Sequence, residues 1–476
     1  MITVKNMARA EKLEQELRCM INDAEVEPLF LLELIDDIEG LGLGYRFRNH
    51  ISQALMKPTP MEGLDVGMEK NLHASALNFR LLRDHGHEIS QDVLKKFKDQ
   101  NGNFMECLRS DVQGLLSLDQ GKVDANIAEQ VSHSMELPLL RRMQRLEARW
   151  SIQACNKRGD ANPILLELAK LDFNLVQSNL QIDLQKVSRW WNHMGLANKL
   201  SFARDRMTEC FFSAVGVVFE PQLSYCRIGL TKVMTLLSTL DDIYDIYGSL
   251  AGLKIFTDAV ERWDTNEVET LPRSMKVFFL ALYNTIDEIA HHIKKEQGYN
   301  IIPHQRKMWA DLCKAFLLEA QWSLNKFTPT FKEYIDNAWL SSSASVILLN
   351  AYILITENIN KDALLYLKNY PDLLRCPSML FRLYNDLVTA QAEMERGENI
   401  NSIACYMQEF NSSEKDARDY MSNLIDETWK KMNKYRVSDL QFSKSFIELS
   451  HNFARTVQCV YQHGDGHGAP DQKNAE

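Results

Sequence analysis

Three carboxylates stand within five residues, at Asp241, Asp242 and Asp245, directly after the apolar stretch 228–240. Positions four apart share one face of a helix, so a helix here would project Asp241 and Asp245 together. Buried carboxylates are unfavourable unless a cation compensates them. Mg²⁺ takes oxygen ligands and commonly binds one or two carboxylates together with substrate phosphates. The pattern therefore predicts metal-assisted handling of a phosphate group beside an apolar cavity.

Acidic pairs also occur on solvated helix faces, and the chain contains a second such pair at Asp36 and Asp37. We interpret Asp36 and Asp37 as a solvated pair without a role in catalysis. The interpretation of residues 241–245 as a metal site therefore depends on residues elsewhere in the chain.

A row of oxygen donors follows downstream, at Asn385, Thr389 and Glu393. Spacings of four residues place an amide, a hydroxyl and a carboxylate on one face of a helix. All three are hard oxygen ligands. An ordinary polar helix face would show the same spacing. With Asp241, Asp242 and Asp245, these three residues form the predicted set of metal ligands.

Arginines accompany both motifs, at Arg204 and Arg206 upstream and at Arg382 three residues before Asn385. A guanidinium group offers planar, bidentate hydrogen bonds to phosphate oxygens and keeps its charge. A surface ion-pair cluster is the alternative explanation for residues 204–206. The residues predicted to bind a phosphate-bearing substrate are Arg204, Asp241, Asp245, Arg382 and Asn385.

The order of these motifs resembles that of the plant class I terpene synthases. The likeness rests on the Arg-Asp-Arg, Asp-Asp-Ile-Tyr-Asp and Asn-Asp…Thr…Glu sequences described above, and it extends to 189–191, 259–264, 336–339 and 461–468. The resemblance implies a lyase that binds three Mg²⁺ ions, with Mn²⁺ as a substitute. It would ionise a prenyl diphosphate to diphosphate and an allylic carbocation.

The resemblance also assigns catalytic roles. Arg204, Arg206 and Arg382 would hydrogen-bond the departing diphosphate. Aromatic faces stabilise cations through their quadrupole, and Tyr461 and His467 correspond to positions near the pocket in this family. His467 could accept a proton or orient a water, although a hydrogen-bonded loop histidine is the alternative.

Composition and periodicity agree with this assignment. At 476 residues, with 45% hydrophobic residues, 20 Gly and 12 Pro, the chain is long enough for two domains. Apolar residues recur at helical period over long stretches, which predicts an all-α fold. We expect an N-terminal, α-barrel-like helical domain over 1–155, a polar linker, and a metal-binding catalytic α-bundle over 164–470.

Charge and cysteine content restrict partners and location. A net charge of −10 argues against nucleic acid or an anionic membrane surface as a partner. We identified no apolar run of about 20 residues, so we expect no stable membrane association. We also expect a monomer. The nine Cys form no CxxC pair, which favours free thiols in a reducing compartment. The first residues lack a targeting leader, so the expected location is cytoplasmic, or plastid if a leader is missing.

Departures from the family pattern bear on the product. A tandem-arginine motif before the first helix is absent, Ser213 stands where many relatives have tryptophan, and Asn401 where many have lysine. The segment 119–133 looks one helix short, which puts stability in doubt. The row from Asn385 to Glu393, in place of a second Asp-rich motif, disfavours chain-elongating prenyltransferases.

Three interpretations remain open from the sequence. The first is conversion of geranyl diphosphate, or also farnesyl diphosphate, to an acyclic product such as linalool, nerolidol, ocimene or myrcene. The second is a cyclising monoterpene synthase of the limonene or cineole type with a truncated N-terminus. The third is a non-catalytic protein that binds prenyl diphosphates.

Overall fold

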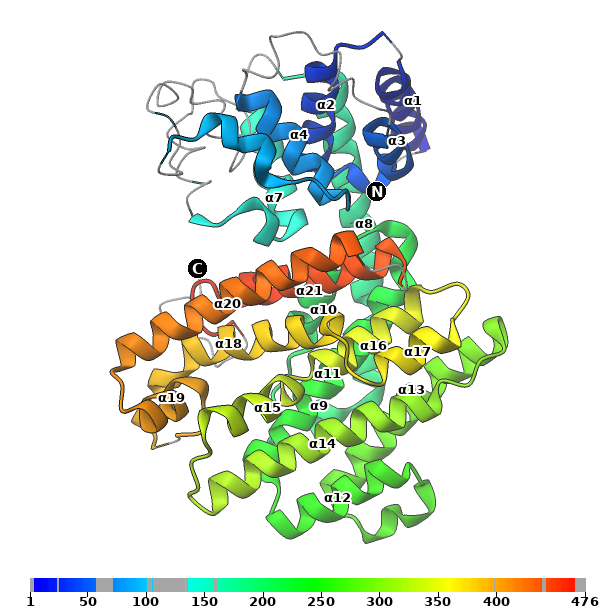
Figure 1. The fold of residues 1–476 in the computed structure, drawn as a ribbon. Coiled ribbons are helices and arrows are strands. Elements are labelled where there is room, and N and C mark those ends of the chain that lie inside the picture. The colour runs from blue at the N-terminus through cyan, green and yellow to red at the C-terminus, as the bar shows by residue number, and fades with distance from the viewer. Residues whose placement is uncertain are drawn as a thin grey trace. The chain divides into compact units, whose positions relative to one another are not determined.

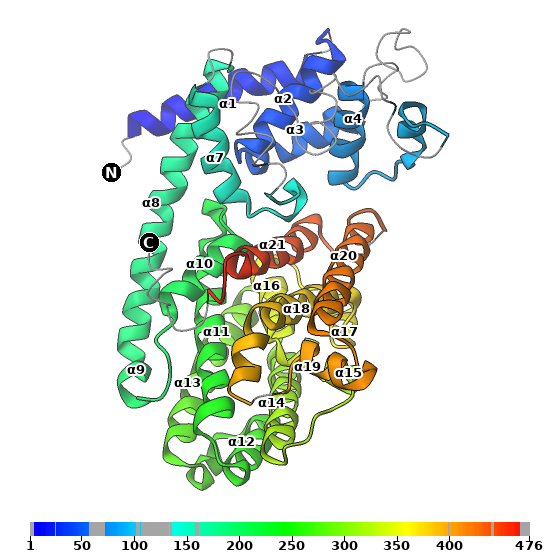
Figure 2. The ribbon, with the colours of Figure 1, turned by 90° about the vertical axis from the view of Figure 1, so that its left-hand side faces the viewer.

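A computed structural model describes residues 4–23, 25–56, 72–100, 105, 133, 136–157, 161–397, 399–438 and 442–466. These residues form helices and connecting loops with no β-strand among them, which confirms the predicted all-α fold (Figures 1 and 2). The chain divides into two compact units. Unit 1 comprises 1–179 with 436–439, and unit 2 comprises 180–435 with 440–476.

The helices of unit 1 pack around one apolar core. Its helices are α1 (Val4–Asn22), α2 (Pro28–Gly40), α3 (Gly44–Met56), α4 (Leu72–Asp84), α7 (Gln144–Lys157) and the first half of α8 (Pro163–Met194), with short 3₁₀ turns η2 (Gln91–Phe97) and η4 (Leu139–Arg141). Leu13, Leu17, Ile35, Phe47 and Leu168 are buried together in this core. The segment 119–132, which we predicted to be shortened, lies outside the described residues.

The acidic pair on α2 is not a solvated pair as we predicted. Asp36 Oδ1 accepts a hydrogen bond of 2.7 Å from Arg80 Nη2 on α4, and only 13% of the Asp36 side chain and 15% of the Arg80 side chain are exposed. The partner lies 44 residues away in the sequence, so no local pattern could identify it. Asp36 therefore contributes to the packing of α2 on α4.

Unit 2 contains the remaining helices. They are α9 (Leu196–Lys199), α10 (Met207–Val217), α11 (Ser224–Asp242), α12 (Leu250–Arg262), α13 (Arg273–Gln297), α14 (Ile302–Leu324), α15 (Phe331–Ser341), α16 (Ala344–Ile355), α17 (Lys361–Leu367), α18 (Asp372–Glu395), α19 (Ser402–Phe410), α20 (Glu414–Ser438) and α21 (Lys444–Tyr461), with the shorter elements η5 (Pro221–Leu223), η6 (Ile243–Tyr247) and η7 (Thr265–Thr270). The division between the units falls within α8, whereas the predicted linker precedes this helix.

Helix α11 runs through the interior of unit 2 and delivers the aspartates to its end. Its threonine hydroxyls are satisfied within the helix, since Thr231, Thr235 and Thr239 each donate to the carbonyl oxygen four residues earlier. This arrangement allows polar residues on a helix that is buried along most of its length. At Gly229 a Cβ atom would lie 2.7 Å from Leu354 Cδ1 of α16, so the glycine permits the close approach of the two helices.

One apolar segment, Phe331–Ile355, has the length and composition of a membrane span, which corrects our prediction that no such run exists. It comprises α15 and α16, and 78% of its most apolar window is buried inside the protein. A helix that is apolar all round is typical of a protein core as well as of a membrane span. The burial favours the core interpretation, and α16 packs against α11, α18 and α21.

Candidate active site

The aspartate-rich sequence spans a change in helix type. Helix α11 ends at Asp242, and Ile243–Tyr247 forms a five-residue π-helix that carries Asp245. Such wider turns are frequent at functional sites. The sequence predicted a regular α-helical spacing for Asp241 and Asp245. In the structure the turn is wider, yet the charges of the two carboxylates still influence each other.

A cavity of about 220 Å³ opens at this end of α11. Its polar part brings together five of the predicted site residues: Arg204, Asp241, Arg382, Asn385 and Tyr461. Its apolar part is lined by side chains that include Met234, Leu237, Ile347, Phe381, Phe453 and Val457. We call the charged part of this cavity its mouth and the apolar part its chamber.

Arg204 links the loop before α10 to the end of α11. Its Nε donates to Asp242 Oδ1 at 2.7 Å, its Nη2 donates to Asp241 Oδ2 at 3.1 Å, and its backbone N–H donates to Asp242 Oδ2 at 2.8 Å. Burial alone would lower the pKa of Arg204, but the two carboxylates raise it above its ordinary value. The guanidinium group therefore stays charged at the cavity mouth.

The adjacent aspartates have different surroundings. The Asp242 side chain is fully buried with both oxygens on Arg204, and it is not among the cavity residues. The Asp241 side chain is 39% exposed and lines the cavity. Asp241 thus has the accessible carboxylate, whereas Asp242 holds the arginine loop. The prediction that Asp242 binds a metal stays a prediction.

The mouth carries an excess of negative charge. Burial raises the pKa of Asp241, and the charge of Asp242 raises it further, while Arg204 and Arg382 act in the opposite direction. The pKa of Asp245 is raised by desolvation beside the other acidic groups and by the charges of Asp241 and Glu319, although part of the residue is exposed to solvent. Two positive side chains do not neutralise these carboxylates, so the site favours an additional cation.

Helix α18 presents the second predicted row. The Thr389 hydroxyl donates to the Asn385 backbone oxygen at 3.1 Å, and the Asn385 amide donates to the Tyr461 hydroxyl at 3.3 Å, which leaves the Asn385 side-chain oxygen available as a ligand. Burial raises the pKa of Glu393, and the nearby Thr389 hydroxyl and the hydrogen bond from Asn401 oppose this shift. One face of α18 therefore carries three neighbouring polar residues, Asn385, Thr389 and Glu393.

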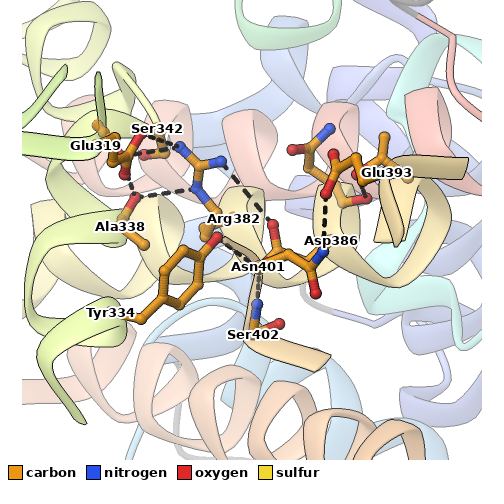
Figure 3. A network of polar contacts seen from close by, with 12 residues as sticks. Glu319, Tyr334, Ala338, Ser342, Arg382, Asp386, Glu393, Asn401 and Ser402 are labelled. Carbon is orange, nitrogen blue, oxygen red and sulfur yellow. Dashed lines mark hydrogen bonds and ion pairs between the residues drawn. The ribbon is translucent and has the colours of Figure 1, made fainter. Parts of the chain in front are cut away.

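Arg382 is held in a network that Figure 3 shows. Its Nε donates to the Ala338 carbonyl oxygen at 3.2 Å and its Nη2 donates to the Ser341 hydroxyl at 2.8 Å. Glu319 and Asp386 flank the guanidinium group, with nitrogen–oxygen distances of 4.0 and 3.9 Å. Four fixed contacts leave Arg382 little rotational freedom beside the cavity.

The remaining predicted catalytic residues differ in position. Tyr461 is buried in the cavity wall, and burial together with the nearby Asp465 carboxylate raises the pKa of its hydroxyl. Arg206 Nη1 donates to Glu209 Oε1 at 2.9 Å, and Arg206 is not among the cavity residues. His467 lies outside the described residues. The roles of all three stay predictions.

Sequence reasoning missed three polar residues of this site. Glu319 was detectable only as an acid next to the apolar stretch 315–318 of α14, and burial raises its pKa. Asp386 directly follows Asn385, but it does not belong to the four-residue spacing of Asn385, Thr389 and Glu393. In the sequence, Asn401 was notable only because many relatives have lysine at this position, although its amide contacts Glu393 at 3.0 Å.

The donor chemistry fits a hard divalent cation. Of the predicted ligands, Asp241 and Asn385 line the cavity, while Asp245 on η6 and Thr389 and Glu393 on α18 are not among the cavity residues. Their carboxylate, amide and hydroxyl oxygens are ligand types that Mg²⁺ accepts. Among the described residues no three His, Cys, Asp or Glu side chains converge closely enough to cage a metal without help. Mg²⁺ commonly combines one or two carboxylates with water and substrate phosphate oxygens.

The fold is all-helical, and its cavity combines an acidic mouth, which favours a cation, with an apolar chamber. These features are those of an enzyme that binds a metal–diphosphate group and an apolar chain. Comparison with known proteins identifies the family. Residues 192–431 match "Terpene synthase family, metal binding domain", and residues 2–120 match "Terpene synthase, N-terminal domain". The chain belongs to the terpene synthase family.

Similar proteins make different products. Tricyclene synthase TPS4, chloroplastic, from Medicago truncatula is 49% identical over 97% of this chain and 84% of its own length. Myrcene synthase, chloroplastic, from Quercus ilex is 45% identical over 98% of this chain and 82% of its own. The crystal structure of isoprene synthase from grey poplar leaves, Populus x canescens, contains three Mg²⁺ ions and dimethylallyl-S-thiolodiphosphate. It matches with a TM-score of 0.93 and 49% identity, over 98% of this chain and 95% of that chain.

Proposed function

We propose that this enzyme ionises a short prenyl diphosphate in the presence of Mg²⁺ and releases an acyclic terpene, with geranyl diphosphate as the leading substrate. The observation that carries the proposal is the single cavity wall shared by Asp241, Arg204, Arg382 and Asn385 above an apolar chamber. Mg²⁺ is proposed from the donor set of this chain and from the three ions in the poplar isoprene synthase.

Each part of the cavity has a task in this reaction. Asp241 and Asp245 on one side, and Asn385, Thr389 and Glu393 on the other, would hold the metal ions, which supply Lewis acidity to the leaving diphosphate. Arg204 and Arg382 donate charge-assisted hydrogen bonds to the diphosphate oxygens as negative charge accumulates there.

The chamber below would hold the hydrocarbon chain and exclude water from the allylic cation. Phe381 forms aromatic contacts with Phe453 and Tyr461, at centroid distances of 5.8 and 6.0 Å. These rings offer π-faces to a cation. Ser213, which also lines the cavity, offers none, so a ring-closed cation gains less stabilisation on that side. Proton loss or water capture from the linear cation is therefore the favoured outcome.

Cavity volume supports a second candidate, conversion of dimethylallyl diphosphate to isoprene. The whole cavity, with its charged part included, has a volume of about 220 Å³, which lies below the roughly 300–1,000 Å³ typical of pockets for drug-sized ligands. It therefore disfavours the fifteen-carbon farnesyl chain and accepts shorter chains. The structural match to an isoprene synthase with a bound dimethylallyl analogue favours the same candidate.

The test is to incubate the purified full chain with dimethylallyl, geranyl and farnesyl diphosphate and Mg²⁺, and to analyse the volatiles by gas chromatography. Acyclic products from the five- or ten-carbon substrate support the proposal, and their ratio decides between the two candidates. Rings such as limonene, cineole or tricyclene would refute the acyclic product. No turnover of any substrate would favour the non-catalytic alternative.

Variants of the proposed ligands provide the internal control. We expect Asp241→Ala and Glu393→Ala each to lower turnover by about 100-fold or more, because a lost ligand removes several kcal/mol of transition-state stabilisation. We also propose a plastid location, since both curated relatives described above carry the word chloroplastic in their names. Imaging of a fluorescent fusion to the complete reading frame tests this.

A further inference from the structure

The amide of Asn401 contacts a predicted metal ligand and caps a helix at the same time. Asn401 is 1% exposed and is the N-cap residue of α19. Its Oδ1 accepts the backbone N–H of Ala404 at 2.8 Å, and its Nδ2 donates to Glu393 Oε2 on α18 at 3.0 Å. Figure 3 shows this contact beside the network of Arg382 and Asp386.

The orientation of this amide follows from chemistry. The Ala404 N–H is a donor, so the atom facing it must be the amide oxygen, and the NH₂ group must then face Glu393. Because the helix cap determines the first contact, the second contact cannot be reversed by rotating the amide. Glu393 is therefore always offered a donor at this oxygen.

The backbone that carries Asn401 is itself anchored to α18. The backbone N–H of Ser402 donates to Asp386 Oδ2 at 2.9 Å, and the Tyr334 hydroxyl donates to the same oxygen at 2.8 Å. Asp386 and Ser402 are 1% and 0% exposed. These buried bonds hold the start of α19 against α18, so the Asn401 amide is already in place before any ligand binds.

We propose that Asn401 is a positioning residue that orients the Glu393 carboxylate for a divalent cation carrying a diphosphate. The inference rests on the proposed function, in which Glu393 is a metal ligand. A donor at one oxygen restricts rotation of the carboxylate and directs its remaining lone pairs. Partners that orient metal ligands in this way typically change metal affinity by about 10- to 100-fold when they are removed.

The decisive variant is Asn401→Asp. Aspartate caps a helix as well as asparagine does, so the α19 N-terminus is kept, but a carboxylate oxygen replaces the donor that faces Glu393. We expect binding of Mn²⁺ in the presence of inorganic pyrophosphate to weaken by about 10- to 100-fold, measured by electron paramagnetic resonance titration. The melting temperature of the metal-free protein should fall, because Asn401 is 1% exposed and the new carboxylate faces Glu393, so the titration is made below the melting temperature of the folded variant. Asn401→Ser, which also caps but is too short to reach Glu393, separates loss of the donor from added charge.

Two further variants restrict the interpretation. Asn360 caps α17 by accepting the Asp362 N–H at 2.9 Å. Asn360→Asp is therefore the same chemical exchange at an exposed cap outside the cavity lining, and it should leave Mn²⁺ affinity unchanged. In a Glu393→Gln background, Asn401→Asp should cause no further loss, because the charge that it repels is gone. A further loss there would show that Asn401 does not act through Glu393.

Unchanged or tighter Mn²⁺ binding in a folded Asn401→Asp protein would overturn the inference, and so would equal losses for Asn360→Asp. If Asn401→Asp does not fold, the same criteria apply to Asn401→Ser. The titration contains no prenyl chain. Failure of the enzyme to convert any prenyl diphosphate therefore refutes the proposed function without deciding this inference, whereas a parent protein that binds no Mn²⁺ with pyrophosphate refutes the inference directly.

Discussion

Exchange of one carboxylate for an amide should separate the roles of the adjacent residues Asp241 and Asp242. Asp242 is fully buried and accepts two hydrogen bonds from Arg204, at 2.8 and 2.7 Å. In Asp242→Asn the amide oxygen keeps one of them, and the NH₂ group faces the other donor. One charge-assisted bond, worth about 1.5–3 kcal/mol, is lost.

Solvent reduces this loss. Because 38% of the Arg204 side chain is exposed, water replaces part of the lost interaction, and the free energy of unfolding should fall by about 1–2 kcal/mol. The melting temperature should then drop by roughly 3 °C. The loop that carries Arg204 is also released, so the KM for the prenyl diphosphate should rise by about tenfold with a smaller change in kcat.

Asp241→Asn should behave in the opposite way. Its carboxylate lines the cavity, and its pKa is raised by burial and by Asp242, so removal of the charge should not destabilise the metal-free protein. Turnover should fall by about 100-fold or more, because a metal ligand is lost. Calorimetry of the metal-free proteins, Mn²⁺ titration with pyrophosphate and steady-state kinetics together distinguish the two variants.

Asp287→Asn is the control, since Asp287 is exposed on α13 and the exchange should be silent in all three assays. The reasoning is refuted if Asp242→Asn weakens Mn²⁺ binding as much as Asp241→Asn does while the melting temperature stays unchanged. That result would make Asp242 a metal ligand.

Three other predictions concern stability, pH and specificity. Asp36→Ala should lower the free energy of unfolding by about 1–3 kcal/mol in urea denaturation, since it breaks the partly buried pair with Arg80, without changing turnover per folded molecule; an unchanged denaturation midpoint would contradict this. In the metal-free protein the pKa of Asp245 is higher in the folded state than in the unfolded state. The contribution of Asp245 to the free energy of unfolding is therefore complete below its unfolded-state pKa, and it is lost as pH rises through its folded-state pKa. Asp245→Asn should therefore melt higher than the parent near pH 8, with the difference shrinking toward about pH 5, and a constant difference would argue against a titrating Asp245. Phe381→Ala should widen the chamber and raise the ratio of kcat/KM for geranyl over dimethylallyl diphosphate by about tenfold or more, and an unchanged ratio in competition assays would show that Phe381 does not limit chain length.

Local spacing was sufficient for much of the site. Asn385, Thr389 and Glu393 could be grouped because residues four apart share a helix face wherever the helix packs. The all-α class followed for the same reason, since apolar periodicity is a property of consecutive residues. The position of Asp241 at the end of an apolar helix could also be predicted from the sequence, because the change from apolar to acidic residues occurs between neighbouring residues.

Long-range packing decided the rest. The sequence alone treats Asp241 and Asp242 as equivalent neighbours, but successive residues point in different directions on a helix, and only the fold determines which direction holds the cavity and which holds Arg204. Asp36 became a partner of Arg80 through a contact across 44 residues.

Asn401 illustrates the same limit within the site. Its spacing of eight residues from Glu393 would fit one continuous helix, but α18 ends at Glu395 and α19 begins at Ser402, so the contact is made across a turn that the spacing does not specify. The sequence by itself determined which side chains could bind a metal and a diphosphate. The tertiary structure decided which of them meet, which are oriented by a neighbour and how large the chamber is, because those properties depend on contacts between helices that no local pattern specifies.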